Sequence, residues 1–170
     1  MSPTTTTAGP GTGSRFLAVY LNDHLAGSTA GVELARRAAS EHAGTDLGAF
    51  FSGLAVEIAA DRQALRRVMA AAGVREQVPK VAAAWLGEKA GRLKLNGQVT
   101  GRSPLTPLVE LEGISMGIHG KRLLWQALRE QQPPGAAAVD LDELLARADR
   151  QLGDVETHRL LAAAALNATG

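Results

Sequence analysis

The chain has 170 residues, of which 45% are hydrophobic and 21% charged, and its formal net charge is +1. Such a length and composition are typical of one globular domain with its own core. The small charge and the aromatic content of 4% argue against a nucleic-acid partner. The absence of cysteine excludes disulfides, thiolate nucleophiles and cysteine-ligated metal centres. No apolar run approaches the roughly 20 residues of a membrane span, so we expect a cytoplasmic protein without a membrane partner.

The first 14 residues are mostly threonine, glycine and proline. They lack the basic and apolar regions of a secretory signal. They also lack the apolar residues that could offset the entropy lost on ordering. We therefore expect a disordered tail over residues 1–14 and a single helical-bundle domain over residues 15–170.

Apolar residues recur at helical spacing through the rest of the chain, and no segment alternates as a strand does. This spacing, together with capping residues, glycines and prolines at the boundaries, predicts five helices. They cover about residues 15–42, 46–72, 79–95, 104–130 and 140–167. Short connections make successive helices antiparallel. The predicted fold is thus all-α, an antiparallel bundle with one extra crossover helix.

Four polar residues on the inner faces of different helices are expected to share one layer of the bundle. At a rise of about 1.5 Å per residue, this layer contains His24, Asp61, His119 and Gln151. Two imidazoles and a carboxylate are the ligands of many non-haem iron centres. His24, Asp61 and His119 are therefore candidate ligands for a single Fe, Mn or Zn ion. The alternative is a metal-free network in which Asp61 pairs with a histidine, and the usual pairing of buried charges favours it.

A second predicted layer contains Glu112, His158 and Arg159, with Glu57 slightly below it. Glu112 opposite Arg159 or His158 would make a natural buried ion pair, so we expect a structural role for this layer. Together with Gln151, these four residues make up the predicted polar network of the core.

The predicted helix over residues 104–130 has two apolar stripes. The stripe that carries Glu112 and His119 is expected to face the shared polar layers. The second stripe contains Leu111, Ile114, Ile118, Trp125 and Leu128. It is expected to cover the third predicted helix or another core layer. The alternative is a face for a homodimer or a partner protein, formed by the third and fourth predicted helices.

Long antiparallel helices with inward carboxylates and histidines resemble the ferritin-like superfamily. The segments Tyr-Leu-Asn-Asp-His-Leu-Ala-Gly from Tyr20 and Leu-Val-Glu-Leu-Glu-Gly from Leu108 are similar to segments of uncharacterised actinobacterial proteins of that class. Di-iron members bind iron through two Glu-x-x-His motifs, and this chain contains none. The resemblance therefore implies the fold, and a metal site here would be atypical for the superfamily.

The leading hypothesis is a small binding or stress-associated protein, with or without an atypical mononuclear metal site in the bundle core. Two alternatives stay open. One is an iron-dependent oxidase or oxygenase, and the other is a metal-free helical interaction module. No motif in the sequence identifies a reaction, a catalytic residue or a substrate.

Overall fold

The computed structural model describes residues 12–77, 103 and 105–166. These residues form four long α-helices and one short 3-10 helix, without a strand, which confirms the all-α prediction. The elements are α1 (Thr12–Glu41), α2 (Asp46–Ala71), α4 (Thr106–Gln131), η1 (Ala136–Ala138) and α5 (Leu141–Ala165). Helix α1 begins at Thr12 rather than at Arg15. The predicted third helix, residues 79–95, and residues 1–11 of the predicted tail lie outside the described residues.

Side-chain caps fix the start of two helices. The Thr45 hydroxyl accepts a hydrogen bond from the Gly48 amide at 3.1 Å, and the Asp140 carboxylate accepts one from the Glu143 amide at 2.9 Å. Gly48 also packs directly against the end of α1, because an added Cβ would lie 2.1 Å from the backbone oxygen of His42. The turn between α1 and α2 is therefore tight, and it sets the position of His42 at the end of the bundle.

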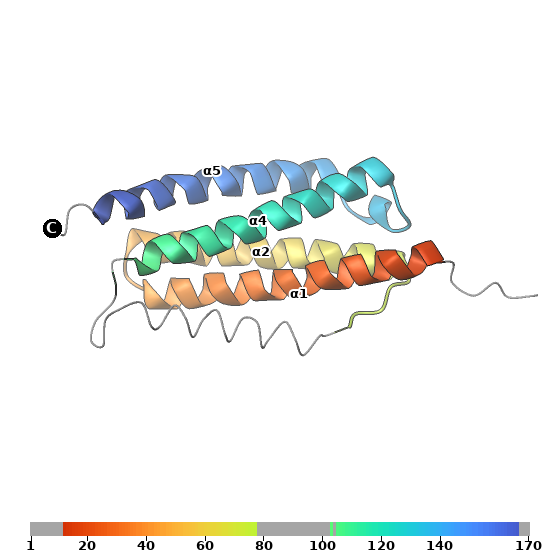
Figure 1. The fold of residues 1–170 in the computed structure, drawn as a ribbon, viewed down its shortest axis with the longest axis horizontal. Coiled ribbons are helices and arrows are strands. Elements are labelled where there is room, and N and C mark those ends of the chain that lie inside the picture. Colours follow the sequence, from red (N-terminus) through yellow and green to blue (C-terminus); the bar gives the residue numbers. More distant parts are fainter. Residues whose placement is uncertain (1–11, 78–102, 104, 167–170) are drawn as a thin grey trace, which may run out of the picture.

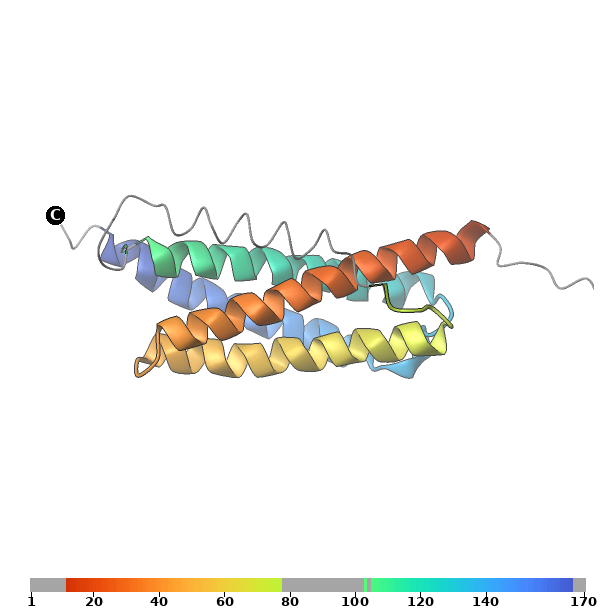
Figure 2. The same ribbon diagram turned by 90° about the horizontal axis from the view of Figure 1, so that it is seen from below.

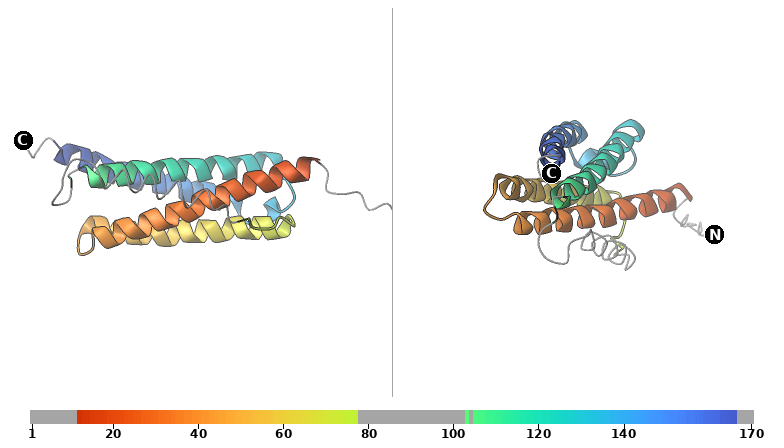
Figure 3. Two further views of the ribbon diagram at one scale, coloured as in Figure 1. Left: turned by 60° about the horizontal axis from the view of Figure 1, so that its bottom comes forward. Right: turned by 60° about the vertical axis from the view of Figure 1, so that its left-hand side comes forward.

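The four long helices form two antiparallel hairpins, α1 with α2 and α4 with α5 (Figure 1). Helices α2 and α4 run in the same direction, as the predicted order of directions requires (Figure 2). Helix α1 runs obliquely, with its C-terminal half beside α2 and its N-terminal half toward the end of α4 (Figure 3). The hairpins meet mainly along α1 and α4, whereas α2 and α5 make few contacts. None of the described helices is long and apolar enough to cross a membrane.

Two clusters of buried apolar side chains form the core, one toward each end of the bundle. The first cluster contains Leu21, Leu25, Ala64, Leu65, Val68, Met69, Leu124, Trp125, Leu128, Ala136, Leu141, Leu144 and Leu145. The second contains Val32, Ala35, Ala38, Phe51, Leu54, Ala55, Ile58, Leu111, Ile114, Ile118, Ala148 and Val155. Between them the helices contribute the polar side chains of Asp61 and Lys121. The core is thus divided by a polar layer, and the candidate site lies at this division.

Candidate functional site

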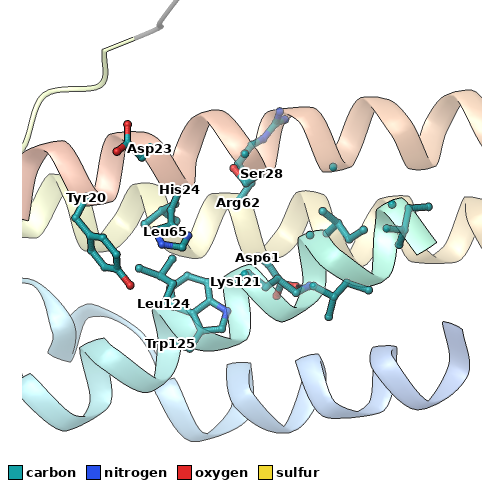
Figure 4. Close-up of a pocket in the computed structure, with 18 residues that line it drawn as sticks. Tyr20, Asp23, His24, Ser28, Asp61, Arg62, Leu65, Lys121, Leu124 and Trp125 are labelled. Carbon is teal, nitrogen blue, oxygen red and sulfur yellow. Dashed lines mark hydrogen bonds and ion pairs between the residues drawn. The ribbon is translucent and has the colours of Figure 1, made fainter. Parts of the chain in front are cut away.

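A cavity of about 430 Å³ lies between α1, α2 and α4 (Figure 4). Its apolar wall comes from both clusters and consists of Ile58, Leu65, Ile114, Ile118, Leu124 and Trp125. Its polar lining consists of Tyr20, Asp23, His24, Ser28, Asp61, Arg62 and Lys121. Small-molecule sites are usually cavities of roughly 300–1,000 Å³ with mainly apolar walls and a few polar groups. The cavity has the size and lining of such a site.

Glycines on α1 and α4 keep this space open. The glycines that line the cavity are Gly27, Gly31, Gly113, Gly117 and Gly120. Glycine inside a helix is less favourable than alanine by about 1 kcal/mol. A Cβ added at Gly27, Gly117 or Gly120 would meet no atom of the described residues within 4 Å, so close packing does not require glycine there. The missing side chains leave volume that alanine or a larger residue would occupy.

Trp125 on α4 forms part of the cavity wall with an unsatisfied donor. Its side chain is 1% exposed, and its Nε1 is buried without a hydrogen-bond partner in the described part of the chain. A buried polar group without a partner costs roughly 1–3 kcal/mol. Tyr20 and His24 reach from α1 toward the same space (Figure 4). The two polar rings of α1 therefore border the cavity, and Trp125 contributes to its wall.

His24 and Tyr20 are both uncharged at neutral pH. The two rings pack edge to face with centroids 4.6 Å apart. Burial lowers the pKa of His24 below its usual value, and nearby Asp23 opposes this shift. Burial raises the pKa of Tyr20. The imidazole therefore offers one donor and one acceptor, and the phenol keeps its proton.

Asp61 is engaged by cations rather than by histidine. This carboxylate is 3% exposed and accepts hydrogen bonds from Lys121 Nζ at 2.5 Å and from Arg147 Nη1 at 2.9 Å. Lys121 also donates to Gln151, and the Gln151 amide donates to Glu57 at 2.7 Å. Burial lowers the pKa of Lys121, whereas the contact with Asp61 opposes this shift. Lys121, which the sequence interpretation did not include, thus joins Asp61 to the buried Gln151. Glu57, predicted to belong to the core network, is exposed and contacts this group only through Gln151.

The predicted metal site of His24, Asp61 and His119 is not assembled. His119 is exposed, and its Nδ1 lies 3.1 Å from the backbone oxygen of Ser115, one turn earlier. Among the described residues, no group of three or more histidine, aspartate or glutamate side chains is placed to hold a metal ion. The reason is the rotation of α4. Lys121 follows His119 by two residues, or about 200° around the helix, and it is Lys121 that faces Asp61.

The predicted buried layer of Glu112, His158 and Arg159 lies near the surface. Arg159 Nη1 is 3.9 Å from Glu112 Oε1, but the Glu112 side chain is 50% exposed. The closer partner of Arg159 is Glu156, at 2.7 Å. His158 is partly buried and stacks on Phe50 with ring centroids 3.8 Å apart. The Glu112–Arg159 contact exists, therefore, as a surface ion pair.

Among the described residues, His42 and Glu110 form a buried histidine–carboxylate pair, which sequence reasoning missed. His42 Nε2 lies 2.8 Å from Glu110 Oε2, and the two residues are 7% and 1% exposed. The pair joins the C-terminal end of α1 to the beginning of α4. Burial raises the pKa of Glu110, and the hydrogen bond with His42 opposes this shift.

The missed residues Glu110 and Lys121 belong to the second apolar stripe of α4. They continue the helical spacing of Ile114, Ile118, Trp125 and Leu128, all of which are buried. The opposite stripe is the outer face, where Met116 is 66% and Leu123 61% exposed. The assignment of the two stripes was thus reversed, although the spacing contained the signal. Because the third predicted helix is outside the described residues, a partner surface formed with it stays a prediction.

Comparison of the chain with protein-family models, curated proteins and solved structures found no match. The ferritin-like assignment accordingly stays a prediction from the sequence.

Proposed function

We propose that this protein binds a small, mainly apolar molecule in the cavity between α1, α2 and α4. The observation that carries the proposal is an open volume of about 430 Å³ beside glycines in mid-helix positions. Small-molecule sites are usually recesses of this size with mainly apolar walls, so the cavity supports a binding role.

Among the sequence-based hypotheses, the cavity favours the binding protein. Both oxygens of Asp61 are already engaged, by Lys121 and by Arg147. This arrangement supports a metal-free form of the binding hypothesis over an iron-dependent oxidase or oxygenase. A role in stress stays a prediction.

The test uses phenylnaphthylamine, an uncharged dye whose fluorescence rises in apolar surroundings. We expect saturable binding to the wild-type protein and loss of binding in Gly117→Leu, because the added side chain would fill the cavity. The matched control is Gly153→Leu on α5. Gly153 is also a helical glycine with no described atom within 4 Å of an added Cβ, but it does not line the cavity. The control should bind the dye as the wild type does.

Circular dichroism and thermal denaturation establish that each variant is folded before binding is compared. Equal binding by the two leucine variants would show that the dye sits elsewhere on the protein. Absence of saturable binding to the folded wild type would also overturn the proposal.

A further inference from the structure

Arg62 on α2 brings a positive charge to the cavity that none of the described residues pairs with. It follows Ile58 by four residues and precedes Leu65 by three, and all three side chains line the cavity from one face of α2. Its Nε is buried without a partner, and within the described ranges the guanidinium makes no hydrogen bond or ion pair. The two terminal nitrogens are not among the buried unpaired atoms, so they stay accessible to a ligand.

The other charged side chains of the lining do not cancel the charge of Arg62. The Asp61 carboxylate accepts hydrogen bonds from Lys121 through one oxygen and from Arg147 through the other. Asp23 is exposed on α1, where water and salt screen its charge, whereas Arg62 is half-buried. The inner lining therefore carries one positive charge without a counterion.

This charge and the apolar wall lie on different sides of the cavity. Ile114, Ile118 and Leu124 line the cavity from α4. The Arg62 side chain lies beside Ser28 of α1, and its guanidinium is directed away from α4 (Figure 4). A ligand that satisfies both sides has an apolar body toward α4 and an anionic group at Arg62.

The single free guanidinium favours a carboxylate as the anionic group. The planar fork of N–H donors in arginine matches the two oxygens of a carboxylate. A carboxylate brings one negative charge, which one guanidinium balances. A phosphate monoester carries roughly 1.5 to 2 negative charges near neutral pH, and the lining offers no second free cation among the described residues.

From these features we infer that the ligand is an amphipathic carboxylate, such as a fatty acid, whose apolar chain fills the cavity and whose carboxylate accepts hydrogen bonds from Arg62. The inference rests on the proposed function and names the chemical class that the same cavity takes. Arg62 is then the residue that distinguishes a carboxylate from an alcohol of equal chain length.

The test compares dodecanoate, dodecanol and dodecylammonium, which share one alkyl chain and differ in the charge of the head group. Displacement of phenylnaphthylamine near neutral pH, below the micelle-forming concentration of each ligand, gives their affinities. An exposed ion pair changes affinity by up to about fivefold, and a hydrogen bond to a buried charge by about 12-fold or more. Because Arg62 is half-buried, we expect Arg62→Met to lower the affinity ratio of dodecanoate to dodecanol roughly 5- to 12-fold.

Three other variants control for the position and the charge. Arg66 lies one turn after Arg62 on α2, is paired with Glu76 at 3.2 Å and does not line the cavity. Arg66→Met should therefore leave the ratio unchanged. Arg62→Lys keeps the positive charge and should retain part of the preference for dodecanoate. Gly117→Leu should abolish binding of all three ligands, because its side chain fills the cavity that they share.

The outcomes separate the inference from the proposed function. The wild type should bind dodecanoate more tightly than dodecanol, and dodecanol more tightly than dodecylammonium, and this order decides the question even where no Arg62 variant folds. If dodecanol or dodecylammonium binds as tightly as dodecanoate, or Arg62→Met leaves the ratio unchanged, the carboxylate inference is wrong and the cavity remains a binding site. If neither phenylnaphthylamine nor the dodecyl series binds the folded wild type, the proposed function fails and the inference fails with it.

Discussion

Replacing Asp61 by leucine would leave the Lys121 ammonium group in the core without its anionic partner. The Lys121 side chain is 12% exposed and lies 2.5 Å from Asp61, which is 3% exposed. Removing one partner of a buried ion pair typically costs about 3–5 kcal/mol. Arg147 adds little to this loss, because it is partly exposed and keeps Glu143 at 2.5 Å. We expect Asp61→Leu to lower the free energy of unfolding by about 3–5 kcal/mol near pH 7.

Two further variants isolate the buried charge. The double variant Asp61→Leu/Lys121→Met should recover most of the loss, because no charge is then left without a partner. The matched control is Asp142→Leu, which removes a carboxylate that is 82% exposed and 3.1 Å from Arg129. An exposed pair contributes about 0–1 kcal/mol, so the control should change stability by no more than that.

The same variant has a defined pH dependence. Asp61 raises the pKa of Lys121 against the lowering effect of burial, so its removal lowers that pKa further. In the folded variant Lys121 then binds its proton less tightly than in the unfolded chain, and stability rises with pH up to about 10.4. Urea denaturation at about pH 7 and about pH 9.5 should show the deficit shrinking as pH rises. A loss no larger than that of Asp142→Leu, or a deficit that grows with pH, would refute the reasoning.

Three other stability predictions follow from single positions. Gly117→Ala should raise the free energy of unfolding by about 1 kcal/mol in thermal denaturation, because its Cβ enters open space; a decrease would contradict this account of the cavity. Burial raises the pKa of Glu110, so its contribution to stability is present below about pH 4.3 and is lost as pH rises through the folded pKa. Glu110→Gln should abolish this slope in urea titrations across that range, and an unchanged slope would assign it to another group. Arg159→Met should cost less than about 1 kcal/mol by urea denaturation, because its partner Glu156 is exposed; a loss of several kcal/mol would mean that Arg159 is buried in solution.

The helices could be predicted from the sequence because their signals are local. Thr45 and Asp140 cap α2 and α5 near the predicted boundaries, and a cap needs only its own next three residues. Apolar spacing likewise predicted α4 as a helix. It did not decide which of the two stripes faces the core, because both contain apolar residues. The prediction placed the stripe with His119 inside the bundle. It therefore expected His119 opposite Asp61, where the structure has Lys121, two residues later. For the same reason it expected Glu112 in the core, where the structure has Glu110.

The cavity could not be predicted for a different reason. Gly27 and Gly117 are ordinary helix-weakening residues when the sequence is considered alone, and they line one space only because α1 packs on α4. The free donor of Trp125 is equally invisible in the sequence, since it depends on which atoms surround the indole. Both features are properties of helix packing.

The interface between the α1–α2 hairpin and the α4–α5 hairpin affects how the native state opens. The cavity is lined by α1 and α2 from one hairpin and by α4 from the other, and few contacts join α2 to α5. A molecule held there touches both halves and acts as a non-covalent cross-link between them. Ligand that binds only the closed form suppresses opening in proportion to its concentration. Amide hydrogen exchange should therefore slow in both hairpins together when the cavity is filled, including in α5, which does not contribute to its lining.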